Sequence, residues 1–149
     1  MKKFFVHAIL VPALAGALFA CSGSQTDAKQ LEGKWNVVEV KGEKVNCENT
    51  PFMEFDMKEN KLHGNAGCNI FNTSVTLDAK DVSALKLEDG MTTMMSCPDM
   101  DMETKILQSM SDVRAVKAGS NPNEMLLVDA EGNVLMVLAR NKYKNGGWQ

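Results

Sequence analysis

The regular recurrence of turn-forming residues limits most strongly how this chain can fold. From residue 31 onward, short apolar runs are separated by clusters of Gly, Asn, Asp and Lys about every ten residues. Many of these runs alternate apolar and polar side chains, which is typical of strands with one buried face. The pattern predicts a single β-rich domain.

Five stretches carry the strand prediction. A strand is expected over 33–40 with Trp35, Val37, Val38 and Val40, and a hairpin over 52–64 with Met53, Phe55 and Met57 alternating. Residues 70–77 place Phe71, Thr73, Val75 and Leu77 on one face, and residues 82–88 predict a further short strand. The last is a hairpin over 124–140, with its tip at 129–133.

One segment departs from this pattern and predicts an amphipathic helix over residues 97–111. Ser96 and Pro98, followed by the acidic residues Asp99, Asp101 and Glu103, are helix-start signals. Apolar residues then recur at helical spacing: Met102, Ile106, Met110 and Val113.

The first residues predict export and a lipid anchor. Lys2 and Lys3 precede an apolar run over 4–20, which is the layout of a bacterial secretory signal. Leu18 to Cys21 resemble a lipobox, so residues 1–20 are expected to be a lipoprotein signal peptide and Cys21 the lipidated first residue of the mature chain. Residues 21–30 are small and polar and predict a flexible tether. The competing interpretation is an ordinary signal peptide cleaved just before a chance cysteine.

Charge argues against a nucleic-acid partner. The chain has a net charge of −3, and loss of Lys2 and Lys3 with the leader would make it more acidic. A nucleic-acid-binding domain needs a basic surface, which this composition does not supply. The expected contact with the membrane is therefore the lipid on Cys21 alone.

Three segments together resemble the META domain, also called the HslJ-like or heat-shock lipoprotein family. They are "GNAGCNIF" with Gly64, Gly67, Cys68, Asn69 and Phe71, "MTTMMSC" leading into the predicted helix, and the closing hairpin. The opening "LEGKWNVVEVKGEKV" is also similar to the start of that family, whereas Cys47 is an addition to its pattern.

The resemblance implies a mainly β (α+β) fold, a small antiparallel, partly open β-barrel-like domain with one amphipathic helix. It places this domain at residues 31–141, followed by a polar tail at 142–149. It further implies an envelope lipoprotein of the kind linked to heat shock, antibiotic tolerance, motility or virulence, with no established enzymatic activity. The resemblance also implies a fold similar to that of secretion pilot proteins, which hold lipid in a partly open barrel.

Candidate chemistry around Cys68 is weak. A cysteine nucleophile needs a base, and His63, the one histidine after the leader, lies an odd number of residues away, on the opposite face of a strand. Gly64, Gly67 and Asn69 instead suit a sharp corner or bulge, with a backbone-lined ligand pocket as the alternative. The sequence predicts no catalytic residue, no cofactor and no metal site.

The segment 91–102 leaves a soft-metal alternative open. Its methionines and Cys97 are donors that suit Cu(I). The competing interpretation is that Met94, Met95, Met102 and Met110 fill irregular core space beside the helix.

The cysteines are expected to be structural. An exported protein meets an oxidising compartment, and lipidation of Cys21 leaves three cysteines, Cys47, Cys68 and Cys97. Cys68 and Cys97 occupy family motif positions and Cys47 does not, so the resemblance makes Cys68 and Cys97 neighbours and a candidate disulfide.

These observations predict a lipid-anchored, non-enzymatic binding or envelope-stress module that faces the periplasm, at the outer membrane. Its partner is expected to be an envelope protein or a small hydrophobic ligand. The alternatives are a copper-handling lipoprotein and a carrier that holds a hydrophobic ligand inside the barrel.

Overall fold

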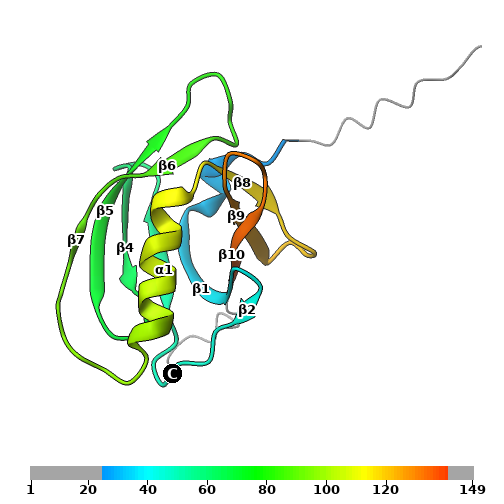
Figure 1. Ribbon diagram of the computed structural model, residues 1–149. Helices are drawn as coiled ribbons and strands as arrows, with labels where there is room; N and C mark the ends of the chain where they lie inside the picture. The colour runs from blue at the N-terminus through cyan, green and yellow to red at the C-terminus, as the bar shows by residue number, and fades with distance from the viewer. Residues whose placement is uncertain (1–24, 141–149) are drawn as a thin grey trace, which may run out of the picture.

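Strands form where apolar and polar residues alternate, and they run antiparallel through the computed structural model, which describes residues 25–140 (Figure 1). The predicted signal peptide, Cys21 and all of the predicted tail lie outside the described residues. The strands are β1 (Gly33–Val40), β2 (Glu43–Lys44), β3 (Phe52–Asp56), β4 (Lys61–Asn65), β5 (Ile70–Leu77), β6 (Leu85–Leu87), β7 (Met91–Thr92), β8 (Ala115–Ala118), β9 (Glu124–Val128) and β10 (Val134–Ala139). A 3-10 turn, η1 (Ala28–Leu31), precedes them, and one α-helix, α1 (Met100–Asp112), lies between β7 and β8. Within residues 25–140 no helix is both long and apolar enough to cross a membrane.

The sheet curls until its two end strands almost meet. The strand order is β6-β5-β4-β3-β1-β10-β9-β8, with β2 beside β1 and β7 beside β5. At the seam between β6 and β8, the Leu85 amide donates to the Arg114 carbonyl (3.0 Å) and the Val116 amide donates to the Ser83 carbonyl (2.9 Å). The structure therefore confirms the predicted partly open, barrel-like antiparallel fold with one helix.

Large apolar side chains fill the interior of this barrel. The most buried of these side chains come from β1, β3, β4, β9 and β10. They include Trp35, Met53, Phe55, Leu62, Leu127, Met136 and Leu138. The Trp35 indole donates to the Leu31 carbonyl (2.7 Å), so its one polar atom is satisfied within the core. A ligand inside the barrel would have to displace these side chains.

A β-bulge in β1 decides which of its valines are buried. The pairing of β1 with β10 shifts between Val37 and Glu39, so one extra residue is accommodated there. Val37 and Val40 are both buried, whereas Val38 points outward and is exposed. A regular alternation cannot bury Val37 and Val40 together, and the bulge is the physical reason that both are inside.

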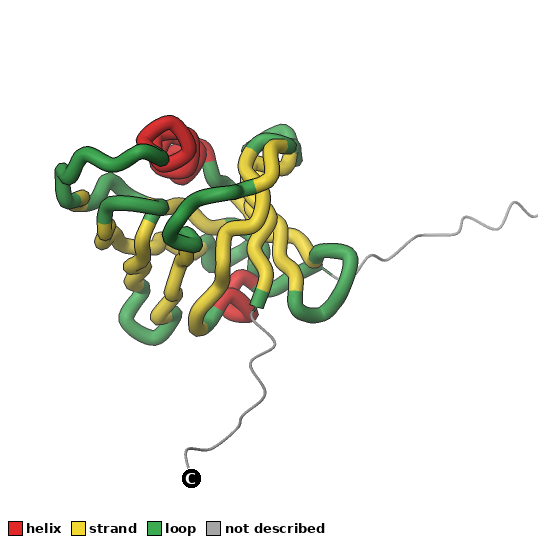
Figure 2. Tube along the Cα trace, turned by 90° about the horizontal axis from the view of Figure 1, so that it is seen from below, coloured by secondary structure: helices red, strands yellow, loops and turns green. Residues whose placement is uncertain are grey.

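Helix α1 lies across the open side of the curved sheet, as the view from below shows (Figure 2). Its buried residues include Ile106 and Met110, and Val113 at its end is also buried, as the apolar spacing predicted. The helix starts at Met100 rather than at residue 97, with Asp99 as its N-cap residue. The Asp99 carboxylate accepts the Glu48 amide (3.0 Å) instead of capping the helix, and Ser96 lies outside the first turn.

The predicted tether is shorter than expected. Residues 25–30 pack on the domain, because Ala28 is buried and its amide donates to the Val82 carbonyl (2.7 Å). Asp27 caps η1 by accepting the Lys29 amide (2.8 Å), and the Thr26 hydroxyl accepts the Ala118 amide (2.9 Å). Apolar Ala28 and a capping aspartate give this stretch a structure that composition alone did not suggest.

A candidate binding groove

The glycine-rich stretch forms a tight corner between β4 and β5. A side chain at Gly64 would overlap the Phe52 carbonyl oxygen and lie 2.6 Å from the Phe71 ring, so the strands here approach too closely for any Cβ. Gly67 has a φ of +116°, in the region that favours glycine. The Asn65 side chain closes the corner by accepting the Gly67 amide (2.7 Å) and donating to the Cys68 carbonyl (3.2 Å).

Cys68 and Cys97, the pair expected from the family motifs, are joined by a disulfide. Their Cα atoms lie 6.0 Å apart, within the usual range for a bridge. The bond ties the corner to the residues immediately before α1. Cys97 is therefore unavailable as a thiolate in this oxidised form.

Asn69 connects the corner to the methionine-rich segment. Its side-chain oxygen accepts the Met95 amide (2.7 Å) and the Thr93 hydroxyl (2.8 Å). Its side-chain nitrogen donates to the Met95 carbonyl (3.0 Å). One asparagine thus satisfies both backbone groups of Met95, as a paired strand residue would.

A buried carboxylate completes this network. Glu103, on the first turns of α1, is 2 % exposed and lies against Asn69, which is 1 % exposed. Glu103 accepts the Asn69 amide (2.6 Å), the Asn69 side-chain nitrogen (2.6 Å) and the Cys68 amide (3.2 Å). Such donors, together with the N-terminal end of the helix, compensate a buried negative charge without a basic partner.

The segment from Met91 to Met95 lies along β5 as an edge strand. β7 pairs with β5 alone among the described strands, with Thr92 opposite Phe71 and Met91 opposite Asn72. The Thr93 amide donates to the Ile70 carbonyl (3.0 Å), and Asn69 holds Met95 in the same way. Because antiparallel residues alternate in direction, the backbone groups of Thr92 and Met94 point away from β5.

Met94 and Met95 do not fill the core, and the prediction that they would is wrong. Met94 is 97 % exposed and Met95 is 54 % exposed. Asn69 holds the backbone of Met95, and both side chains lie outside the cluster that contains Met110 and the partly buried Met102. Two apolar thioether side chains are therefore displayed at the surface.

These side chains border an open groove between the edge strand and helix α1, which we call the Met groove. It encloses about 490 Å³. Thr92, Met94 and Met95 line its strand side, and Met100, Thr104 and Leu107 line its helix side. A smaller hollow of about 180 Å³ continues past Gly90, Thr92 and Leu107 toward Ser111.

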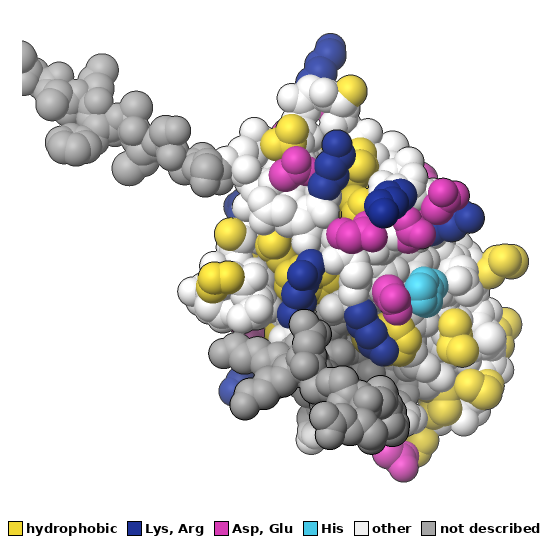
Figure 3. Space-filling model, turned by 180° about the vertical axis from the view of Figure 1, so that it is seen from behind, with side chains coloured by type: hydrophobic (Ala, Val, Ile, Leu, Met, Phe, Trp, Pro, Cys, Tyr) yellow, Lys and Arg dark blue, Asp and Glu magenta, His cyan; other side chains and the backbone are white. Residues whose placement is uncertain are grey.

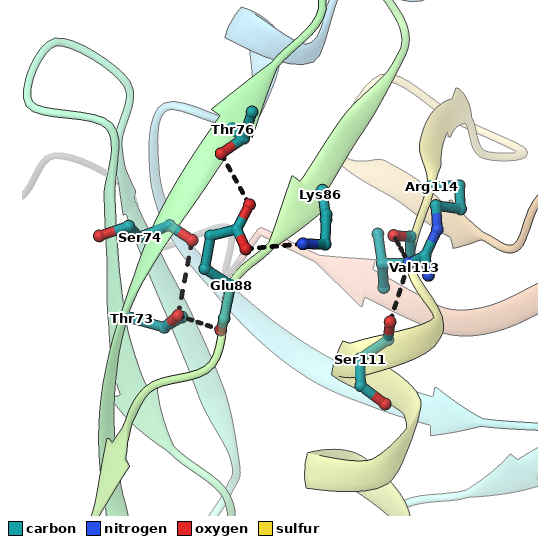
Figure 4. Close-up of polar contacts among 8 residues, drawn as sticks. All are labelled: Thr73, Ser74, Thr76, Lys86, Glu88, Ser111, Val113 and Arg114. Atoms are coloured by element: carbon teal, nitrogen blue, oxygen red, sulfur yellow. Dashed lines mark hydrogen bonds and ion pairs between the residues drawn. The ribbon is translucent and has the colours of Figure 1, made fainter.

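The far end of the hollow is fixed by polar contacts (Figure 4). Glu88 accepts from Thr76 (2.8 Å) and pairs with Lys86 (2.7 Å), which lowers its pKa, and its carbonyl accepts the Thr73 hydroxyl. Opposite, the Arg114 guanidinium donates to the Ser111 carbonyl (2.8 Å) at the end of α1. The strand wall and the helix wall are thus each held in place.

Cys47 is a free thiol on the loop before β3. Burial, together with the nearby Asp99 carboxylate, raises the pKa of the Cys47 thiol. A raised pKa leaves less of the reactive thiolate at neutral pH, so this cysteine has the opposite of an activated environment.

Other candidate chemistry does not converge. His63 lies on the outer side of β4 and pairs with Glu54 (3.3 Å), whereas Cys68 is buried and bonded. On the face shown in Figure 3, basic and acidic side chains alternate and the imidazole sits beside an acidic group. Within residues 25–140 the structure gathers no group of three or more His, Cys, Asp or Glu side chains fit to hold a metal ion.

A family model described as the META domain matches residues 28–142, a range that contains the corner, the disulfide and the Met groove. The chain belongs to the META domain family. No curated protein matches it.

Two solved structures share the fold of this META domain. One is described as the NMR structure of the protein from Burkholderia xenovorans, with a TM-score of 0.57, 16% identity, and coverage of 95% of this chain and 99% of that one. The other is a crystal structure of a DUF4847 family protein from Bacteroides vulgatus, with a TM-score of 0.54, 16% identity, and coverage of 76% and 96%. At these identities the likeness concerns the fold alone.

The sequence pattern of this META domain points to Asn69 but not to its partner, Glu103. Glu103 was assigned to the helix dipole, although it shares a stripe with Ile106 and Met110 at helical spacing. An acid on an otherwise apolar stripe was the available signal, since such a carboxylate must find buried donors.

Proposed function

We propose that this META-domain protein is a lipid-anchored lipoprotein of the outer membrane whose domain faces the periplasm and binds an envelope partner in the Met groove, without catalysis. The observation that carries the proposal is the display of Met94 and Met95 at the wall of a groove whose frame is fixed. Flexible, polarisable thioethers on a rigid support are a common device for adaptable binding surfaces. The support here is the Asn69–Glu103 network and the Cys68–Cys97 disulfide.

The sequence of the leader supports the proposed anchor. Lys2, Lys3, the apolar run and the Leu18–Cys21 box support lipidation of Cys21. Cys21→Ser is expected to leave unprocessed precursor and to abolish labelling by palmitate. The lipidated wild type is expected in the outer-membrane fraction of a density gradient. Normal processing of the wild type without lipid would overturn the anchor.

Binding in the groove is tested by photo-crosslinking in living cells. A photoreactive amino acid at position 94 is expected to give a discrete adduct, because Met94 stands at the groove wall. The matched control is position 134, since Val134 is also exposed but lies on β10. Equal adducts from both positions, or none from position 94, would refute groove binding.

The two alternatives are less well supported by the geometry. A hydrophobic carrier would need space that the interior side chains already occupy. A copper site that includes Cys97 would first require reduction of the disulfide. The Met groove is already open in the structure, so a ligand can enter it without such a rearrangement.

A further inference from the structure

The free edge of β7 faces the Met groove and offers backbone groups that nothing in the described chain pairs. β7 has β5 on one side, and the groove lies on its other side. The backbone groups of Thr92 and Met94 point toward that open side, because those of Thr93 and Met95 are taken by Ile70 and Asn69. An unpaired edge strand of this kind is a template for another extended chain.

The charge around the groove selects among occupants. Residues 88–104 contain Glu88, Asp89, Asp99, Asp101 and Glu103 and no Lys, Arg or His. Three of these acids are engaged: Glu88 with Lys86, Asp99 with the Glu48 amide, and Glu103 in the buried network. Asp89 has no partner among residues 25–140 and lines the smaller hollow on the strand side. Asp101 has none there either, but it lies on α1 outside the residues that line the groove.

We propose that the Met groove binds an extended, basic and apolar segment of a partner protein by adding it as a strand to the free edge of β7. The backbone of the segment pairs with Thr92 and Met94, its apolar side chains pack on Met94, Met100 and Leu107, and a basic side chain faces Asp89. A second copy of this chain would bring the same carboxylates against each other. An anionic lipid headgroup would meet the same repulsion.

This inference rests on the proposed function and specifies the class of partner. Its test uses the full chain purified from the envelope into nanodiscs of uncharged lipid. The probe is a short fluorescent peptide that alternates lysine and valine, followed by anisotropy. Three peptide controls keep the length: glutamate in place of lysine, alternate amides N-methylated, and leucine with lysine arranged at helical spacing.

Saturable binding is expected for the lysine–valine peptide alone. N-methylation removes the donors that a strand must supply, so binding should fall about tenfold or more. Equal binding of the N-methylated or helical peptide would overturn strand addition, and equal binding of the glutamate peptide would overturn the charge argument. Absence of saturable binding by the lysine–valine peptide would overturn the inference outright.

Variants of the chain locate the contact. Thr92→Pro removes an outward-facing amide, a change that edge strands tolerate, and is expected to abolish binding with little change in the melting temperature. Asp89→Asn should weaken binding about threefold or more at low salt, whereas the matched change Glu131→Gln on the β9–β10 turn should not. If Thr92→Pro fails to fold, the N-methylated peptide still tests strand addition, because it is added to the wild-type protein.

Hydrogen exchange on the wild type provides the second readout. The bound peptide should slow exchange at the Thr92 and Met94 amides. Protection elsewhere, vesicle binding that requires Met94, or a peptide-independent dimer through this edge would overturn the inference. If the peptides fail while position 94 still crosslinks a protein in cells, the partner class is wrong and the proposed function stands.

Discussion

At the scale of single residues, Asn69 is the position on which the groove most depends. Its side chain replaces the strand partner that β5 would otherwise supply to Met95, and its backbone and side-chain nitrogens donate hydrogen bonds to Glu103. Only Asn and Gln carry both a carbonyl acceptor and an NH2 donor on one side-chain amide, and Gln is one methylene longer. Asn69 therefore holds in place the strand wall of the groove that the proposed partner would contact.

Asn69→Ala is expected to destabilise the domain by about 2–4 kcal/mol. It removes one donor to the Glu103 carboxylate and leaves the Met95 backbone without its hydrogen-bond partner. Urea unfolding measures the change. The matched control is Asn72→Ala, an exposed position on β5, which should stay within about 0.5 kcal/mol of wild type. An equal decrease in the free energy of unfolding for both variants would show that the Asn69–Glu103 network adds no particular stability.

The disulfide predicts non-additive variants. Cys68→Ala and Cys97→Ala each remove the same bridge, which closes a separation of 29 residues, so each should cost about 3 kcal/mol. The double variant should cost about as much as one single variant. Alkylation after unfolding without reductant should label Cys47 but neither Cys68 nor Cys97. Labelling of all three would show that the bridge is absent in the purified protein.

At the scale of elements, close approach of β3, β4 and β5 sets the corner that holds Asn69. Gly64 is the point of closest approach, between the Phe52 carbonyl and the Phe71 ring. Both contacts belong to neighbouring strands in the sheet, so a larger residue has to push strands apart.

Gly64→Ala is accordingly expected to cost more than about 3 kcal/mol and to lower the melting temperature sharply. The matched control is Gly42→Ala, where the added carbon meets open space and only the φ of +81° is unfavourable. That control should cost about 1 kcal/mol. Equal effects on thermal unfolding would mean that the strands at Gly64 yield more easily than their packing indicates.

The elements also show what the sequence could and could not predict. The long alternating strands and the helix face were predictable because burial imposes a period on side chains. The short strands β2, β7 and β8 were not, since two to four residues contain too little pattern and their pairing comes from distant strands. Met94 and Met95 were assigned to the core on composition, whereas their outward position depends on the Asn69 side chain, a contact across 26 residues.

At the scale of the whole molecule, the seam is the weakest line of the barrel. β6 and β8 are linked by a single bridge, from Ala84 to Ala115, and by the amides of Leu85 and Val116. All other neighbours in the sheet order share longer ladders. Separation of β6 and β8 therefore breaks fewer backbone hydrogen bonds than separation of any other neighbours in the sheet order.

Native-state hydrogen exchange should reveal this order of stability. The Leu85 and Val116 amides are expected to exchange by local opening, well before the central amides of β1 and β10. Addition of low denaturant should leave the seam rates nearly unchanged, because local opening exposes little surface. Uniform exchange of seam and centre would show that the barrel opens only as a unit.

The pairing of β1 with β10 has a consequence for biogenesis. A chain is made, and would be passed through a membrane, with its amino end first, so β1 emerges long before its neighbour β10. Until the last strand arrives, β1 has one side open, and the indole of Trp35 and the side chain of Val40 lack their cover. A product truncated before Val134 keeps this edge of β1 unpaired, which favours aggregation or proteolysis. The topology thus leaves β1 without its second neighbour, and the sheet incomplete, until β10 has been made.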